Sequence, residues 1–422
     1  MTNKVLVIGG GAAGLAAAKT LVDMHKEVVL VEKEESLGGL VRELTCKGVS
    51  ECRNCGVCYV VDRAAEILAE PAAEVFLRSE IVSVDRKDEG FMVRIRSGAR
   101  YVSSSCIGCG RCVEVCPVEG GAIHPPKGSG RPTTYWIDRD RCLHFKKKKC
   151  ERCAEVCSTD AVVYDDRATN VTRHVSSVIL ASGIEPVDAS EVPRLGYGSI
   201  PDVMSSVDAE RILNERGRIV RPSDGAAPKK IAMIQCVGSR SEKTGVEYCS
   251  KFCCKYGTKI AQLLMDIDPD IDLDFYFMDL RTLYEPQDDF KRWAASKKRK
   301  VEKKKVPQVR LIRSMPSQAY PGDGGGVVLR SSGESDVETT DTPYDLAILS
   351  VGMRPRAVPE ALGSSLGVEV DELGFMRCSE GESSSGMFFI GAACEPMDIE
   401  ETITKAIAAA AEAAAQRTGG SR

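Results

Sequence analysis

The sequence predicts an α/β protein made of two Rossmann-type halves, with a small cysteine-rich domain inserted into the first half. A glycine-rich turn between apolar strands opens the chain, and two cysteine runs with iron–sulfur spacing interrupt the strands and helices that follow. A second strand-to-helix unit begins near Pro228. The 422 residues are enough for two or three domains, each with its own core.

The composition excludes several function classes. A net charge of −4 offers no general basic surface for nucleic acid or for an anionic membrane. No apolar run approaches the roughly 20 residues that span a bilayer, and the opening strand leaves no room for a signal peptide, so we expect a cytoplasmic protein without direct membrane insertion. The chain has 18 cysteines, which in this setting indicate metal ligation or redox chemistry rather than a disulfide framework.

The N-terminal segment "KVLVIGGGAAGLAAAKTLVDMHKEVVLVEKE" has the pattern strand, glycine turn, helix, strand. Gly9, Gly11 and Gly14 hold the glycine positions of a dinucleotide-binding turn, which need a tight bend, close approach to a pyrophosphate and close helix packing. Glu32 follows the second strand, where an acid accepts hydrogen bonds from ribose hydroxyls. Because strand, turn, helix and acid agree, we prefer a dinucleotide site to an ordinary glycine-rich turn, and FAD to NAD.

Further segments complete the predicted flavin fold. The turn "ESLGG" follows the second strand, where two-dinucleotide flavoproteins bring another glycine turn toward the flavin. "SSVILASGIEP" and "YDLAILSVGMRPR" are apolar strands ending in glycine, as expected where the chain crosses between two domains. Near the C-terminus, a small-residue turn leads into a long Ala-rich helix whose first amides would face the flavin. The predicted FAD contacts are Gly9, Gly11, Ala12, Ala13, Gly14, Glu32, Lys33, Gly38, Gly39, Gly183, Gly352, Gly391 and Ile399.

Two cysteine runs between these segments have the spacing of a bacterial two-cluster ferredoxin. "CIGCGRCVEVCP" matches the pattern fully, whereas "CLHFKKKKCERCAEVCS" has seven residues between its first two cysteines and Ser158 in place of proline. In such ferredoxins the fourth cysteine of each run ligates the other cluster, and the alternative, a zinc module, needs no triple run. We predict one [4Fe–4S] cluster on Cys106, Cys109, Cys112 and Cys157, and another on Cys142, Cys150, Cys153 and Cys116.

A third cysteine group follows the LGG turn and should lie near the flavin. Its members are Cys46, Cys52, Cys55 and Cys58. We favour a fourth iron–sulfur cluster on these thiols, with one zinc ion or a dithiol pair beside the flavin as the alternatives.

The last cysteine group lies in the second Rossmann-like half. Its first strand, in "PKKIAMIQCVGSR", runs into Cys236 where a second glycine-rich nucleotide turn would be expected. Cys249 and the adjacent Cys253 and Cys254 follow, at the start of a helical pattern. We predict that these four thiols hold a cluster, in preference to a structural thiol pair or a vicinal disulfide.

Two lysine runs are interpreted as solvated surface. Lys146–Lys149 lies inside the second ferredoxin-like run, where docking of an acidic partner is the alternative. "KKRKVEKKK", residues 297–305, is predicted to be a charged surface helix or helix end. Cys378 and Cys394 are taken as isolated buried thiols.

These motifs divide the chain into three predicted domains. Residues 1–98, 169–225 and 343–422 would form the FAD-binding domain, and residues 99–168 the inserted ferredoxin-like domain. Residues 226–342 would form the second Rossmann-like domain, with its four-cysteine site in place of a nucleotide site.

This combination resembles the A subunit of heterodisulfide reductase, the flavin and iron–sulfur component of complexes found in anaerobes. The resemblance covers nearly the whole chain and depends on "VIGGGAAGLAAA", "CIGCGRCVEVCP", "IQCVGSR", "YCSKFCC" and "ILSVGMRPR". It implies a thioredoxin-reductase-like fold, one FAD, [4Fe–4S] clusters, and an oxidoreductase subunit that splits or relays electron pairs between flavin and clusters. It also implies partners: other subunits of such a complex, and ferredoxin or another electron carrier; a homodimer stays open.

The resemblance further implies that Lys259, shortly after the double cysteine, is a catalytic lysine near the flavin ring, where the alternative is a plain surface lysine on the helix. Relatives of this kind commonly have fewer cysteines in the region of residues 46–58, and longer ones carry further ferredoxin domains at the C-terminus. Electron splitting is therefore left open. The competing hypotheses are a stand-alone NAD(P)H-dependent flavin oxidoreductase similar to thioredoxin reductase or to the glutamate synthase small subunit, and a non-catalytic cluster scaffold.

Overall fold

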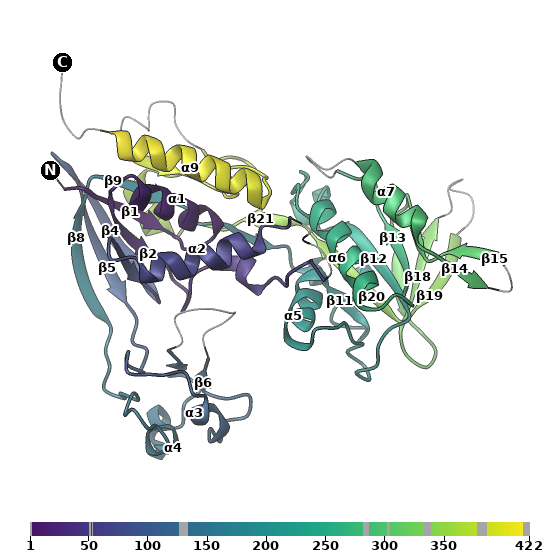
Figure 1. Cartoon of the computed structure of the whole chain (residues 1–422), viewed down its shortest axis with the longest axis horizontal. Coiled ribbons are helices and arrows are strands. Elements are labelled where there is room, and N and C mark those ends of the chain that lie inside the picture. Colours follow the sequence, from purple (N-terminus) through teal and green to yellow (C-terminus); the bar gives the residue numbers. More distant parts are fainter. Residues whose placement is uncertain are drawn as a thin grey trace.

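Two larger α/β domains and one small inserted domain make up the molecule, as Figure 1 shows for the computed structural model. The inserted domain projects from the first α/β domain, on the side away from the long C-terminal helix. The structure describes residues 2–49, 52, 54–125, 134–281, 287–301, 304–332, 339–377 and 386–416.

The first domain has three layers: helices, a five-stranded parallel sheet and a smaller antiparallel sheet. Val5 and Val28 pack on the helices, while their neighbours Leu6 and Val29 pack on the antiparallel sheet. Because both faces are covered, these strands are apolar throughout instead of alternating. The strand order is β24 (Met387–Phe389), β9 (Ser177–Leu180), β1 (Lys4–Ile8), β2 (Glu27–Val31), β3 (Ala73–Phe76); the helices are α1 (Ala12–Asp23), α2 (Val57–Ala69) and α9 (Ile399–Ala415); the antiparallel strands are β4 (Ser79–Lys87), β5 (Gly90–Ser97) and β8 (Thr169–Val175).

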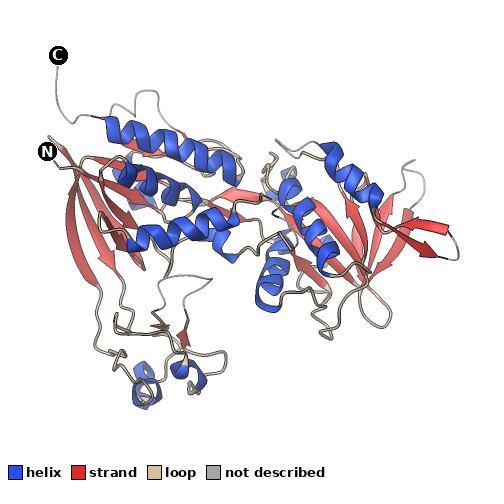
Figure 2. Ribbon diagram, viewed as in Figure 1, coloured by secondary structure: helices blue, strands red, loops and turns tan. Residues whose placement is uncertain are grey.

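The second domain repeats this plan. Figure 2 shows its parallel sheet beside helices, with a small antiparallel sheet at the far end. The strand order is β11 (Val203–Ser205), β20 (Leu346–Val351), β12 (Lys230–Val237), β13 (Asp272–Tyr276), β16 (Val309–Ile312); the helices are α5 (Ser206–Arg216), α6 (Cys253–Ile267) and α7 (Gln287–Ser296); the antiparallel strands are β17 (Gln318–Pro321), β18 (Val327–Ser332) and β19 (Thr339–Tyr344).

Two strands of this sheet come from segments that the predicted domain boundaries placed in the flavin domain. β11 and β20 pair with each other, and β20 also pairs with β12, so residues 203–205 and 346–351 belong to the second sheet rather than the first. The division therefore differs from the predicted boundaries at 225 and 342. An apolar strand pattern identifies a buried strand but does not say which of two similar sheets it enters.

The chain crosses between the two domains on a two-stranded antiparallel link. It is formed by β10 (Ile184–Pro186) and β21 (Met353–Pro355), which directly follow the glycine-ending strands noted in the sequence. The predicted architecture, two α/β domains with a small domain inserted into the first, is confirmed.

The inserted domain leaves the first domain after Ser97, at the end of β5, and returns at Thr169, the first residue of the neighbouring strand β8. Its two short helices lie against each other. Its elements are α3 (Arg111–Glu114), β6 (Ile123–His124), β7 (Trp136–Ile137), a π-helical turn (His144–Lys148) and α4 (Arg152–Glu155).

One predicted element is wrong. β14 (Lys298–Val301) and β15 (Lys304–Pro307) pair as antiparallel strands, where a charged surface helix or helix end was predicted over residues 297–305. A run of charges has no apolar period, so its sequence does not distinguish a helix from paired strands. Among the described residues, no helix is both long enough and apolar enough to cross a membrane.

Candidate functional site

The first site is the turn between β1 and α1, which fits a dinucleotide. A Cβ on Gly14 would lie 1.8 Å from the carbonyl oxygen of Gly9, so only glycine lets the helix approach the strand this closely. α1 begins at Ala12, next to Ala13, and of the described side chains none caps its N-terminus. Its first N–H groups and the positive end of its dipole are therefore available to a pyrophosphate.

Glu32 lies at the end of β2, beside this turn. Its side chain is buried, and its Oε2 accepts a hydrogen bond from the N–H of Gly10 at 2.6 Å. Its Oε1 accepts one from the N–H of Glu34 at 2.9 Å, which holds the carboxylate in place for a ribose. The neighbouring Lys33 is exposed.

The LGG turn contacts the dinucleotide turn directly. The N–H of Gly38 donates to the carbonyl of Gly10 at 2.7 Å, and a Cβ on Gly39 would lie 3.1 Å from the Cα of Gly11. Both Gly38 and Gly39 have positive φ angles, 109° and 54°, which favour glycine. The two glycine turns thus form one backbone surface that a flat cofactor can approach closely.

The remaining predicted flavin contacts lie at the ends of strands. Gly391 follows β24, and its Cβ would meet Ala13 at 2.9 Å, so this turn adjoins the start of α1. Gly183 follows β9 and has open space beside it. Gly352 instead lies against the second domain, where its Cβ would meet Ser239 at 2.5 Å.

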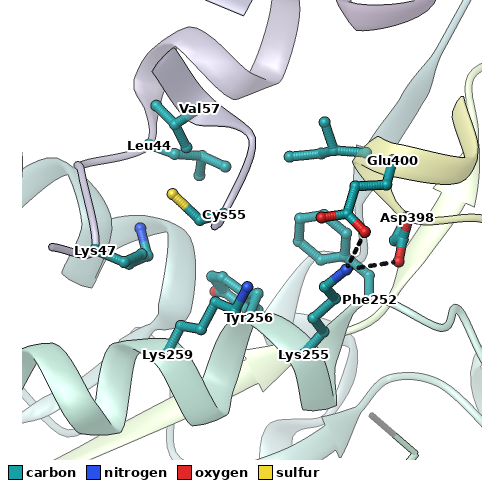
Figure 3. Close-up of a pocket in the computed structure, with 11 residues that line it drawn as sticks. Leu44, Lys47, Cys55, Val57, Phe252, Lys255, Tyr256, Lys259, Asp398 and Glu400 are labelled. Carbon is teal, nitrogen blue, oxygen red and sulfur yellow. Dashed lines mark hydrogen bonds and ion pairs between the residues drawn. The ribbon is translucent and has the colours of Figure 1, made fainter. Parts of the chain in front are cut away.

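A pocket lies between the two α/β domains, and Figure 3 shows its lining. The second domain contributes one face of α6, including Lys259, and the first domain contributes the start of α9 and the chain from the LGG turn to α2. Its lining residues are Leu44, Lys47, Cys55, Val57, Phe252, Lys255, Tyr256, Lys259, Asp398, Ile399 and Glu400. The predicted catalytic lysine and the predicted flavin contact Ile399 therefore share one pocket.

Charged groups around this pocket are paired. Lys47 and Glu210 form an ion pair of 2.6 Å in which the two side chains are 2% and 0% exposed. Burial raises the pKa of Glu210, and Lys47 opposes that rise. The Nζ of Lys259 donates to the backbone carbonyl of Asn54 at 3.0 Å, which ties α6 to the loop between two of the third-group cysteines.

The structure brings the predicted ligands of the first ferredoxin cluster to one pocket. Cys106, Cys109, Cys112 and Cys157 all line it, although the fourth comes from the other cysteine run. Burial, with the neighbouring thiols of Cys153 and Cys106, raises the pKa of Cys112 to about 11. The donor set is all thiol, as an iron–sulfur cluster requires.

The second predicted set is also gathered. Burial raises the pKa of the Cys153 thiol, and the neighbouring thiols of Cys142 and Cys116 raise it further. A hydrogen bond with Tyr164 opposes this rise. Tyr164 also lies near Cys150. The N–H of Ala122 donates to Cys116 at 3.3 Å, and the N–H of Ala161 donates to Cys157 at 3.2 Å, so the two halves of the insert hold their fourth cysteines alike.

The four-cysteine set of the second domain is assembled from a strand, a loop and a helix. The sulfur atoms of Cys236 and Cys253 are 3.9 Å apart, and these residues form a buried cluster with Cys254. Cys249 precedes them in the loop and accepts a hydrogen bond from the N–H of Lys251 at 3.4 Å. A hydrogen bond from Cys253 lowers the pKa of Cys254 to about 7.

The backbone around these thiols is strained. The φ angles of Cys236, Arg240 and Lys251 are 57°, 56° and 56°. These values lie in the left-handed region, which residues other than glycine rarely adopt. The pairing of β12 with β20 shifts register between Ile234 and Val237, which turns Cys236 out of the regular strand. Such strain persists where the surrounding fold holds it, and it concentrates at functional sites.

Two arginines surround the same thiols. Arg240 forms a hydrogen bond with Cys236, and Arg281 forms one with Cys249. Both guanidinium groups are paired with Asp279, Arg281 at 3.0 Å, and the carbonyl of Asp279 accepts from the thiol of Cys254 at 3.7 Å. Positive charge and N–H donors are thus directed at the sulfur atoms.

The third cysteine group is spread out. Cys55 faces the interdomain pocket, whereas Cys46, Cys52 and Cys58 are exposed. Cys394 is partly buried, and Cys378 lies outside the described residues. Across the described ranges, no group of three or more His, Cys, Asp or Glu side chains is close enough to hold a single metal ion.

Sequence reasoning missed several residues of these sites. The Lys47–Glu210 and Arg240–Asp279 pairs join residues far apart in the chain, so no local pattern marks them; Arg281 lies only two positions from Asp279. Lys255 and Asp398 had a signal: Lys255 lies midway between Lys251 and Lys259 at four-residue spacing, and "DIEE" has the form of a helix capping box, which the structure contains.

Comparison with known proteins gives the same two parts. Residues 105–161 match the family described as 4Fe-4S dicluster domain, and residues 7–78 match the NAD(P)-binding Rossmann-like domain. Thioredoxin reductase from T. acidophilum is similar in structure, with a TM-score of 0.50 and 14% identity over 98% of this chain and 97% of that one. This likeness shows the shared fold.

Curated relatives match nearly the whole chain. The A subunit of the H(2):CoB-CoM heterodisulfide,ferredoxin reductase of Methanothermobacter marburgensis is 32% identical over 434 residues, covering 98% of this chain and 63% of the relative. One of the iron-sulfur A subunits of the CoB–CoM heterodisulfide reductase of Methanopyrus kandleri is 32% identical over 443 residues, covering 100% of this chain and 65% of the relative. This chain therefore spans a little under two thirds of their length.

The matches agree with the geometry. FAD and [4Fe–4S] clusters are the cofactors of this chain, since the dicluster domain and the flavoprotein fold are both present and the glycine turns and cysteine sets fit these groups. The chain belongs to the family of iron–sulfur flavoproteins typified by the A subunit of heterodisulfide reductase.

Proposed function

We propose that this chain is an electron-transfer subunit of a heterodisulfide-reductase-like oxidoreductase complex. The observation that carries the proposal is the buried group of Cys236, Cys253 and Cys254 at the strand-to-helix connection of the second domain. In a nucleotide-binding half, that connection would be a short glycine turn holding a pyrophosphate. Here β12 ends at Val237 and α6 begins only at Cys253, with Cys249 in the loop between them.

The chain's residues serve two kinds of cofactor chemistry. FAD exchanges electrons in pairs, whereas each [4Fe–4S] cluster exchanges them singly. The glycine turns at Gly9, Gly11 and Gly39, together with Glu32, would bind the dinucleotide. The insert would present clusters near the surface, because Cys109 is exposed.

Lys259 would act beside the flavin. It lines the interdomain pocket on α6, opposite the start of α9 (Figure 3). As a cationic hydrogen-bond donor it would favour a reduced, anionic ring and would deliver a proton to it.

We assign three [4Fe–4S] clusters to the chain: two in the insert and one on Cys236, Cys249, Cys253 and Cys254. A fourth on Cys46, Cys52, Cys55 and Cys58 needs the loop before α2 to close around it, since three of these thiols are exposed. The loop has no strand pairing to prevent that movement among its described residues.

The proposed partners are the other subunits of the complex and ferredoxin or another electron carrier, acting in the cytoplasm. The names of the relatives describe subunits of reductases that use ferredoxin and the CoB–CoM heterodisulfide. A homodimer is compatible with this role. Relay of electrons and splitting of electron pairs would use the same cofactors. We propose relay for this chain, because it is the simpler of the two mechanisms.

The second candidate, a stand-alone NAD(P)H oxidoreductase, requires a nucleotide site on the second domain. The strained turn at Cys236 and the buried thiols occupy that position. NAD(P)H should accordingly fail to bleach the flavin of the isolated chain.

Anaerobic purification with flavin and iron analysis tests the proposal. About one FAD and at least about 12 irons per chain are expected, because each cubane holds four. A chain without flavin, or with iron for only two clusters, would contradict it. Reduction of the flavin by NAD(P)H would favour the second candidate instead.

A further inference from the structure

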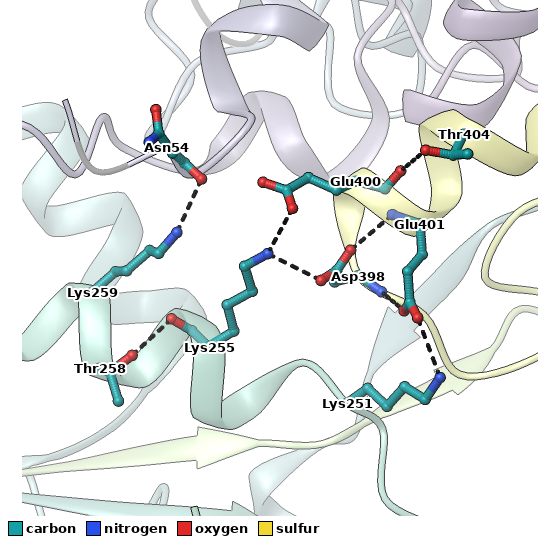
Figure 4. A network of polar contacts seen from close by, with 9 residues as sticks. All are labelled: Asn54, Lys251, Lys255, Thr258, Lys259, Asp398, Glu400, Glu401 and Thr404. Carbon is teal, nitrogen blue, oxygen red and sulfur yellow. Dashed lines mark hydrogen bonds and ion pairs between the residues drawn. The ribbon is translucent and has the colours of Figure 1, made fainter. Parts of the chain in front are cut away.

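Three lysines of the second domain reach toward the flavin domain at a regular spacing. Lys255 and Lys259 lie on α6, and Lys251 lies two residues before that helix begins. Residues four apart share one face of a helix. Figure 4 shows all three side chains directed across the domain boundary.

Each lysine has its own acceptor on the flavin domain. Lys251 pairs with Glu401 at 3.4 Å, and Lys259 donates to the carbonyl of Asn54 at 3.0 Å. Lys255 pairs with two carboxylates, Asp398 at 3.0 Å and Glu400 at 3.1 Å.

The Lys255 pair is partly withdrawn from water. The side chain of Lys255 is 12% exposed and that of Asp398 is 5% exposed. Ion pairs shielded from solvent are screened less than surface pairs, and removing one partner leaves the other uncompensated.

The two helices joined by these pairs are the ones that carry the redox sites. α6 begins with Cys253 and Cys254, two of the proposed cluster ligands. α9 begins with Ile399, which lines the pocket, and Asp398 caps it through a reciprocal capping box with Glu401. The lysine pairs therefore connect the cluster-bearing helix end to the flavin-side helix end.

We propose that Lys251 and Lys255 are positioning residues for electron transfer: they hold α6 against the flavin domain and so set the separation between the four-cysteine site and the flavin. The inference rests on the proposed function. In each transfer one electron leaves the flavin and enters the cluster, or the reverse, and the lysines neither make nor break a bond. The rate of such a transfer falls exponentially with distance, so a small movement of α6 has a large effect.

A second, geometric reason favours fixed positioning. The antiparallel link of β10 and β21 is a narrow connection between the domains, as Figure 2 shows. Domains joined by so short a link move relative to each other unless further contacts hold them, and the buried Lys47–Glu210 pair is one such contact beside the lysine pairs of α6. The lysine pairs supply further restraint between α6 and the start of α9 (Figure 4).

The test uses the flavin- and cluster-loaded chain with Lys255→Met, which removes the charge and keeps an unbranched apolar stem. Lys405→Met is the matched control, because Lys405 pairs with Glu395 wholly within the flavin domain and both side chains are about half exposed. Lys255→Arg is the conservative variant. Three quantities are measured: cofactor content, hydrogen exchange of residues 251–259 and 398–401, and the rate of electron exchange between flavin and clusters after rapid mixing with dithionite.

We expect Lys255→Met to keep its FAD and iron and to transfer electrons between flavin and clusters more slowly. The amide hydrogens of both segments should exchange about fivefold faster, because the lost ion pair is worth up to about one kcal/mol. The wild-type rate should fall with added salt, and the rate of the Met variant should not. Lys255→Arg and Lys405→Met should both behave like the wild type.

If Lys255→Met shows unchanged hydrogen exchange and an unchanged electron-transfer rate, the positioning role is wrong. If the wild-type protein contains no FAD or iron, the proposed function is wrong instead. If Lys255→Met loses its cofactors, Glu400→Gln decides, because it removes the negative charge of one of the two carboxylates at an exposed position. Slower transfer in that variant supports the positioning role, and wild-type behaviour excludes it.

Discussion

The cysteines of the insert and those of the second domain reach the same kind of site by different routes. In the insert, eight cysteines lie within residues 106–157, on loops and one-turn helices, and several thiols are partly exposed. In the second domain, Cys236 and Cys253 come from a strand and a helix 17 positions apart, and both are buried. In the insert, three thiols of the first site come from one short run and the fourth from the other run, whereas the thiols of the second domain meet only when the sheet and helix have packed.

The two regions differ in what supports them. The insert has a small core of its own, in which cysteines and a few aromatic side chains make up much of the apolar contact. The thiols of the second domain lie at the end of a fully covered parallel sheet, with Gly257 of α6 packed against Gln235 beside the bulge. Loss of a ligand should therefore have mainly local effects in the insert and wider effects in the second domain.

Cys253→Ala should have the largest effect. Cys253 is 1% exposed and contacts both Cys236 and Cys254, so the substitution removes a proposed ligand and leaves a gap in a packed site. We expect the loss of about four irons and a lower melting temperature, with the EPR signals of the insert retained. Iron analysis, EPR and thermal denaturation measure these changes. Loss of an insert signal would contradict the independence of the two regions.

Cys116→Ala tests the exchange of ligands within the insert. Because Cys116 lies near Cys153 of the other run, the variant should lose the cluster of Cys142, Cys150 and Cys153. Cys157→Ala is the matched variant and should lose the other cluster. EPR of the two proteins should show complementary signals, while the melting temperature changes less than in Cys253→Ala. The same signal missing from both variants would refute the exchange.

Arg240→Met should change a potential without removing a cluster. The guanidinium donates to Cys236 and brings a positive charge to the site, which stabilises the more reduced state. Its loss should lower the reduction potential of the second-domain cluster by roughly 60 mV, a tenfold change in a one-electron equilibrium. A redox titration followed by EPR measures it, with the insert clusters of the same sample as the internal control. An unchanged potential would show that Arg240 serves only its pair with Asp279.

The smallest effect is expected from Lys146→Gln combined with Lys149→Gln. Both side chains are exposed on the loop between Cys142 and Cys150, and a solvated loop predicts a change in stability within about 0.5 kcal/mol. Cluster content and potentials should be those of the wild type. Electron transfer to an acidic acceptor protein, measured at low and high salt, should also be unchanged. A loss of salt dependence in the variant would instead identify the run as a docking site.

Local patterns allowed much of the molecule to be predicted. The turn at Gly9, Gly11 and Gly14, the two ferredoxin-like runs and the helix beginning at Cys253 depend on contacts between near neighbours in the chain, and the structure contains each of them. The pairing of β14 with β15 was missed, because a run of charges has no apolar period that would predict a strand or a helix.

By itself the sequence determined the two fold units, the cofactor types and the cysteine groups, since each is specified by residues whose spacing matches one turn, one helix or one loop. Only the tertiary structure decided that β11 and β20 join the second sheet, that Lys47 meets Glu210, and that Lys255 reaches Asp398. These contacts join residues more than a hundred positions apart or choose between two equivalent sheets. No local period encodes such a choice, because it follows from which buried surfaces can be covered at once when both domains pack.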